Sequence, residues 1–179
     1  MGHLPEEVLF VDETFLTVDR QRIEFLKQEA LKNKRTRIRL CTHANMSNSV
    51  HEMLIVHVKG NYIPPHKHIN KSESFHVIEG SADLFFFDEN GEIIKIISMG
   101  DTNSGKVFYY RVSQAIYHTL IVTSDIFVFH ETTRGPFIPS ETIFGSWAPH
   151  EDDEKAVKIY MDELMERKKK MSNVSVEIS

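Results

Sequence analysis

The clearest structural signal in the chain is "GNYIPPHKHINKSESFHVIEG", which runs from Gly60 to Gly80. Side chains alternate along an extended backbone, so His66 and His68 point the same way. The two prolines before His66 keep the approach extended, and a glycine at each end suits a turn. The pattern predicts a hairpin that directs His66, His68 and Glu73 inward.

Two imidazoles and a carboxylate suit a divalent transition metal such as iron, zinc, manganese or nickel. A solvated histidine-rich turn has the same residue types, and the spacing alone leaves both interpretations open. A fourth ligand would come from another inward strand position. His118 fits, because its same-face neighbours Ile116, Leu120 and Val122 are apolar and a histidine among them needs a partner.

Outward from this stretch, short β-rich segments separated by turn signals fill residues 35–131. "DENG" at Asp88–Gly91 predicts a hairpin turn. Strands at this spacing without intervening helices predict an antiparallel sandwich or barrel. We expect one domain over residues 1–179, with a helix at 12–34 (N-cap Asp19), a covering loop at 132–150 and a second helix at 151–171.

The glycines, histidines and glutamate of the opening stretch match the first cupin motif at every defined position: Gly60, His66, His68, Glu73 and Gly80. Of the second cupin motif only His118 is present, because Ser113 and Ala115 replace the usual proline and glycine. Segments such as "YIPPHKH", "ESFHVIEG" and "TTRGPFIPSETIFGSWAPHEDD" resemble the WbuC family of cupin-fold metalloproteins.

This resemblance implies an all-β, cupin-type double-stranded β-helix (jelly-roll) barrel with an N-terminal and a C-terminal helix. It also implies a metal site made by His66, His68, Glu73 and His118, and a link to bacterial surface-polysaccharide metabolism. It does not supply a substrate, and the metal identity stays open.

Further polar side chains share a face of "RTRIRLCTH": Arg37, Arg39 and His43. At a barrel mouth they would bind an anionic substrate by forked hydrogen bonds. An edge strand with its charged face in water explains them equally well.

Three other residues are candidates for substrate contact. His57 shares a face with apolar residues and is either a pocket residue or a hydrogen-bonded structural histidine. Glu131 is either an inward acid–base group with a raised pKa or a carboxylate at a strand end in water. Trp147 either stacks on a sugar ring or anchors its loop to the core. His51 and His130 are expected at the surface or at an interface.

Composition limits the classes of partner. The net charge is −5 with no basic stripe, which argues against nucleic acid. We find no apolar run long enough to span a membrane and no secretory signal pattern, and the one cysteine, Cys41, fits a reducing cytoplasm. We therefore expect a cytoplasmic protein. We also expect it to be a homodimer, because exposed strand edges favour pairing with a second copy.

The sequence thus gives two function hypotheses. One is a metal-dependent enzyme, of isomerase, epimerase or oxygenase type, acting on a sugar or sugar-nucleotide derivative. The other is a non-catalytic module that binds a carbohydrate or another small ligand through the metal.

Overall fold

The computed structural model describes residues 6–176, which form eleven strands, two α-helices and one 3₁₀ helix. In chain order they are β1 (Val8–Phe10), α1 (Arg20–Lys32), β2 (Arg37–Cys41), β3 (Val50–Val58), β4 (His66–His68), β5 (Glu73–Glu79), β6 (Ser81–Phe87), β7 (Ile93–Gly100), β8 (Tyr109–Val112), β9 (Tyr117–Val122), β10 (Ile126–Arg134), η1 (Pro139–Glu141), β11 (Thr142–Phe144) and α2 (Glu154–Val176).

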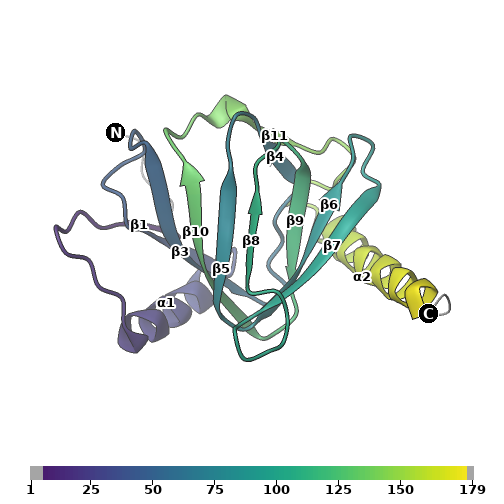
Figure 1. Ribbon diagram of the computed structural model, residues 1–179, viewed down its shortest axis with the longest axis horizontal. Coiled ribbons are helices and arrows are strands. Elements are labelled where there is room, and N and C mark those ends of the chain that lie inside the picture. Colours follow the sequence, from purple (N-terminus) through teal and green to yellow (C-terminus); the bar gives the residue numbers. More distant parts are fainter. Residues whose placement is uncertain (1–5, 177–179) are drawn as a thin grey trace.

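The strands form two sheets that face each other (Figure 1). One has the order β1-β2-β3-β10-β5-β8 and the other β11-β4-β9-β6-β7. The facing sets β3-β10-β5-β8 and β4-β9-β6-β7 are the two halves of an eight-stranded jelly roll. All named strand pairs are antiparallel except β1 with β2. The predicted all-β class with a helix at each end is confirmed.

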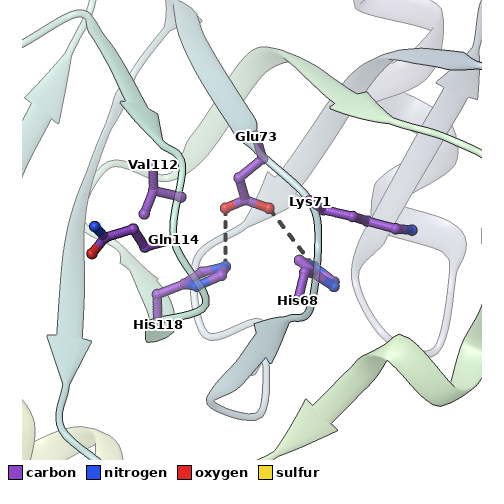
Figure 2. Close-up of a pocket in the computed structure, with 6 residues that line it drawn as sticks. All are labelled: His68, Lys71, Glu73, Val112, Gln114 and His118. Carbon is purple, nitrogen blue, oxygen red and sulfur yellow. Dashed lines mark ion pairs between the residues drawn. The ribbon is translucent and has the colours of Figure 1, made fainter.

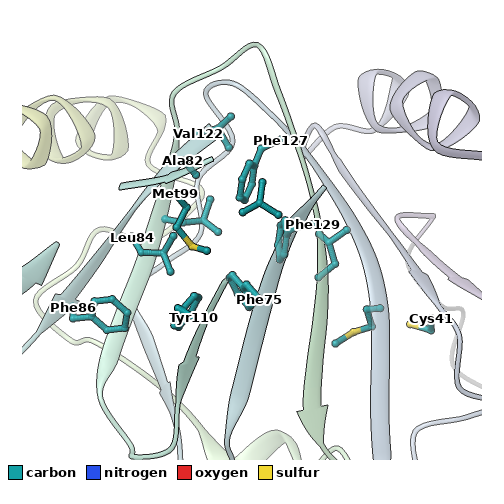
Figure 3. Packing of buried hydrophobic residues seen from close by; sticks show 14 residues of the cluster. Cys41, Phe75, Ala82, Leu84, Phe86, Met99, Tyr110, Val122, Phe127 and Phe129 are labelled. Atoms are coloured by element: carbon teal, nitrogen blue, oxygen red, sulfur yellow. The ribbon is translucent and has the colours of Figure 1, made fainter. Parts of the chain in front are cut away.

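The core lies between the two sheets (Figure 3). Inward side chains of β5, β6, β9 and β10 meet there and form one apolar cluster that includes Phe75, Leu84, Leu120, Phe127 and Phe129. Three of its rings, Phe75, Phe127 and Phe129, pack with neighbouring centroids 4.6 and 5.0 Å apart. Aromatic packing of this kind closes one end of the barrel with large, tightly fitting side chains.

Each helix covers the outer face of one sheet. Leu26 and Ala30 of α1 pack on a cluster from β2, β3 and β10. Leu164 of α2 packs on Phe85 and Phe87 of β6. Because the helix covers this face while the core covers the other, nearly every residue of β6 is buried, which explains its continuous apolar run "LFFF".

Several predicted bounds are wrong. The first helix begins at Arg20 rather than residue 12; Asp19 caps it, its carboxylate accepting a hydrogen bond from the Arg22 N–H at 2.9 Å. The covering loop 132–150 is shorter than expected, because β10 continues to Arg134 and β11 lies within the loop. The second helix runs over Glu154–Val176, since no glycine or proline ends it near residue 171.

The predicted hairpin around the two histidines is also wrong. β4 belongs to one sheet and β5 to the other, so the segment between them crosses the barrel instead of reversing within a sheet. Side-chain alternation still directs both strands' polar residues inward, because alternation depends only on extended backbone. The structure contains, in the part that it describes, no helix long and apolar enough to cross a membrane.

Gly91, in the β6–β7 turn, generates a stability prediction. It has φ +85°, and an added Cβ would lie 2.6 Å from Cδ2 of Trp147, whereas Gly105 has φ +71° with open space around it. We expect Gly91→Ala to destabilise the fold by several kcal/mol, against about 1–2 kcal/mol of backbone strain for Gly105→Ala. Denaturant midpoints of the two variants measure the difference, and equal midpoints would show that Trp147 yields freely.

Candidate metal centre and the barrel cavity

Three histidines converge between the sheet strands β4 and β9. His66 and His118 are direct Cα partners across this pair, and His68 lies two residues along β4. Their side chains offer ring nitrogens that all lie within 4.8 Å of one another. Strand pairing and alternation therefore bring together residues that are separated by half of the barrel sequence.

Each ring is held through its Nδ1 atom. Nδ1 of His66 lies 2.9 Å from the Pro64 carbonyl oxygen, and Nδ1 of His118 lies 2.9 Å from that of Ile116. Nδ1 of His68 lies 3.1 Å from the Thr142 hydroxyl oxygen. A carbonyl oxygen only accepts, so Nδ1 of His66 and of His118 carries the proton. In a neutral ring that is protonated at Nδ1, Nε2 keeps the free lone pair through which a histidine binds a metal ion.

Glu73 approaches the histidines from the opposite sheet (Figure 2). Its side chain is 5% exposed. Oε1 lies 3.0 Å from Nε2 of His118 and accepts a hydrogen bond from the Tyr110 hydroxyl at 3.0 Å, and Oε2 lies 3.7 Å from Nε2 of His68. Tyr110 thus fixes the carboxylate where the free histidine nitrogens point.

The electrostatics of the cluster are those of a site that holds positive charge. Burial opposes ionisation of Glu73, but His118, together with His66 and His68, outweighs it, and the pKa of that carboxyl is lowered to about 2. Burial disfavours charge on His118 too, yet Glu73 raises its pKa to about 9. Burial lowers the pKa of His66 to about 3 and also lowers that of His68. In the metal-free protein, therefore, His118 carries an extra proton and a positive charge, whereas the His66 and His68 rings stay neutral.

These residues fit a divalent metal ion. Three neutral imidazoles and one carboxylate are the donor set that zinc, iron, nickel and manganese share, and every donor is oriented by a second hydrogen bond or by packing. The proton on His118 would leave when an ion binds. His66, His68, His118 and Glu73 are thus placed to act as ligands; their role remains a prediction.

A cavity of about 590 Å³ opens beside this cluster. Its apolar floor includes Ile55, Phe75, Leu84, Leu120 and Phe129, and its mouth includes the exposed side chains Met46, Phe137 and Phe144. This volume is in the range of sites for small metabolites.

The basic strand β2 supplies one wall of the cavity, as one of the two interpretations predicted. Arg37 is held by Glu7, whose Oε1 accepts from Nη2 at 2.9 Å and from Nε at 3.2 Å. Arg39 and His43 also line the cavity. The His43 ring stacks on His51 at 4.1 Å between centroids, so His51 is buried in the wall and its predicted surface position is wrong. The substrate roles of Arg37, Arg39 and His43 stay predictions.

His57 and Glu131 face the same cavity. Burial lowers the pKa of His57 to about 3, so the ring is neutral, and its Nδ1 has no hydrogen-bond partner among the described residues. Burial, and after it the negative charge of Glu73, raises the pKa of Glu131 to about 8. Of the two interpretations of Glu131, the strand-end carboxylate in water is wrong, because β10 continues past it to Arg134 and Glu131 lines the cavity.

Trp147 lies outside the cavity. Its ring packs on Phe87 at 5.0 Å and on Tyr117 at 5.9 Å between centroids, and next to Gly91 and Gly145. The structure therefore places it as a loop anchor against the outer face of a sheet. Sequence reasoning missed Tyr110, Lys71 and Thr142, which all line the cavity; none carries a spacing signal that separates it from ordinary strand or loop residues.

Comparison with known proteins gives a family match over residues 18–99, described as a domain of unknown function (DUF6016). The comparison with curated proteins found no match.

Solved structures similar to this chain include cupin-fold proteins, all at low identity. Oxalate decarboxylase from Bacillus subtilis is 20% identical over 55% of this chain and 24% of its own, with a TM-score of 0.44. The capsular polysaccharide assembling protein CapF from Staphylococcus aureus is 19% identical over 55% and 27%, with a TM-score of 0.45. The Cnp3 cupin domain from Schizosaccharomyces pombe is 13% identical over 55% and 64%, with a TM-score of 0.42. The chain spans less than two thirds of each, and the fold class rests on its own strand order.

The raised pKa of Glu131 generates a prediction about the metal-free protein. A carboxyl whose pKa is higher in the folded state stabilises the fold below its unfolded pKa and loses that contribution as pH rises through about 8. We therefore expect Glu131→Gln to gain stability relative to the parent between pH 4.5 and 8, by at most about 1.4 kcal/mol per pH unit. Urea denaturation at pH 4, 6 and 8 measures it, with Glu52→Gln as an exposed control on the neighbouring strand. A constant difference would contradict a carboxyl that stays neutral in the folded protein.

Proposed function

We propose that this protein is a metal-dependent cupin of the WbuC type that acts on a sugar or sugar-nucleotide derivative of bacterial surface-polysaccharide metabolism. The observation that carries the proposal is the convergence of ring nitrogens from three histidines and the Glu73 carboxylate on one wall of a metabolite-sized cavity. The sugar class is supported by the resemblance of the chain's motifs to that family.

A bound divalent ion would supply a Lewis acid that polarises a carbonyl or hydroxyl oxygen. The chain's own residues do the rest. Tyr110 holds Glu73 through its hydroxyl, and carbonyl oxygens hold His66 and His118. The apolar floor excludes water from one side of a ligand. Glu131, on the same cavity wall as Phe75, is the group best placed to give or take a proton.

The metal assignment predicts a selective loss of metal content. We expect His66→Ala and Glu73→Gln to lower the metal bound per chain at least about tenfold, since each removes an oriented ligand. Elemental analysis of the purified variants measures it. His76→Ala is the matched control, because His76 lies on β5 beside the site but faces outward. Full metal content in both site variants would refute the assignment.

The sugar assignment predicts selective ligand stabilisation. We expect a nucleotide sugar or related sugar derivative to raise the melting temperature of the metal-loaded protein, since a ligand that binds only the folded state stabilises it. A thermal-shift screen of such compounds measures this, and proton NMR of each hit detects turnover. A shift without turnover would assign the non-catalytic binding module instead, and no shift with any sugar derivative would contradict the substrate class.

A further inference from the structure

The charges that line the cavity are only partly used by the protein itself. Four basic and three acidic side chains face it: Arg35, Arg37, Arg39, Lys71, Glu7, Glu73 and Glu131. Glu7 takes up two of the arginines, since its Oε1 lies 3.1 Å from Nη1 of Arg35 and 2.9 Å from Nη2 of Arg37. Glu73 is taken up by the histidines and Tyr110. Two cations and one carboxyl group remain.

Arg39 is the first of these cations. Its backbone N–H donates to the Glu7 carbonyl at 2.9 Å, which fixes the strand, but its half-buried guanidinium has no hydrogen bond or ion pair with any other described residue. Arg37, two residues earlier on the same face, is paired with Glu7. A guanidinium left with open donors in a partly apolar cavity is poised for a planar anion, which it binds through two parallel hydrogen bonds.

Lys71 is the second cation, and the backbone around it is held in place. Asn70, with φ 61°, turns the chain before it. The neighbouring backbone is held on both sides, because the Ile69 N–H donates to the Glu141 backbone carbonyl at 2.9 Å and the Thr133 hydroxyl donates to the Ser72 carbonyl at 3.2 Å.

The amine of Lys71 is left without a polar partner. Its side chain is buried, at 9% exposure, and runs away from Glu73 (Figure 2). Nζ lies 5.2 Å from the centre of the Phe137 ring and forms no hydrogen bond or ion pair in the part of the chain that the structure describes. A lysine is rarely buried without a partner, because its charge must be compensated.

We propose that the substrate carries an anionic group, a carboxylate or a phosphate, which Arg39 and Lys71 bind inside the cavity. The inference rests on the proposed function in that it names the substrate class of the same cavity: a sugar acid or a sugar phosphate rather than a neutral sugar. Arg39, Lys71 and Glu131 all line this one cavity. Glu131 forms no ion pair with either among the described residues, so their charge is left for a ligand.

The test is an NMR titration of the zinc-loaded protein with sodium acetate and with inorganic phosphate, at constant ionic strength. We expect the side-chain Nε–H signal of Arg39, assigned by its loss in Arg39→Gln, to shift and saturate. Arg111, which is exposed on β8 outside the cavity, should not shift. Lys71→Met should weaken the binding at least about tenfold, because it removes a charge-assisted bond. Lys95→Met, on exposed β7, is its control and should change nothing. The tighter of the two anions identifies carboxylate or phosphate as the natural group.

A shift that does not saturate, or an equal shift at Arg39 and Arg111, would overturn the proposal, because it would reflect general screening. Metal content measured on the same samples separates this result from the proposed function. If Arg39 responds in a protein that binds no metal, the anion site stands and the metal-dependent function falls. If the protein binds metal and Arg39 does not respond, the opposite holds.

Discussion

The contact between His118 and Glu73 is the interaction on which the polar half of the barrel depends. The two residues come from opposite sheets and meet at 3.0 Å, with side chains that are only 8% and 5% exposed. A carboxylate at 5% exposure would be far too costly alone. The histidine and Tyr110 offset that cost in the metal-free protein, and a metal ion would do so more strongly. The sheets are therefore joined at this end by charge and at the other by packing.

The division between the ends follows from the register of the large sheet. Glu73 pairs with Thr133, which pairs with His51, so one row across the sheet is polar. Two residues further along, Phe75, Glu131 and Met53 form a mixed row, and beyond it Val77, Phe129 and Ile55 form an apolar row. The rows thus become less polar with every two residues along the strands, and the cavity lies where polar and apolar rows meet.

Much of this was predictable because it depends on alternation along single strands. His118 shares a face with Leu120 and Val122, and His66 with His68, so their common direction follows from parity before any pairing is known. The same reasoning placed Arg37, Arg39 and His43 on one face, though it could not choose between cavity and solvent. That choice depends on β1 and β3 flanking β2, and the short β1 has no sequence pattern of its own.

The failures have the same physical origin. Whether the segment after His68 turns back or crosses to the other sheet depends on pairings far away in the sequence, so the predicted hairpin was wrong. Tyr110 and Lys71 become part of the site only through a neighbouring strand and through a loop held by Glu141 and Thr133. Trp147 carries a residue type that suits sugar binding, but Gly91 and Gly145 leave a slot for its ring outside the barrel. Residue type indicates what a side chain can do, and tertiary contacts decide where it does it.

The jelly roll leaves the reaction open, because the same fold supports many chemistries. The arrangement of charge is more informative. A metal at the histidines and the two cations Arg39 and Lys71 would give the cavity two positive centres inside a chain whose net charge is −5. Such a cavity attracts anions against the field of the rest of the molecule, so the attraction must act at short range, through directed hydrogen bonds rather than long-range steering. Its selectivity would then depend on the separation between the metal and the anion-binding group, which fixes the length of the molecule that can span both.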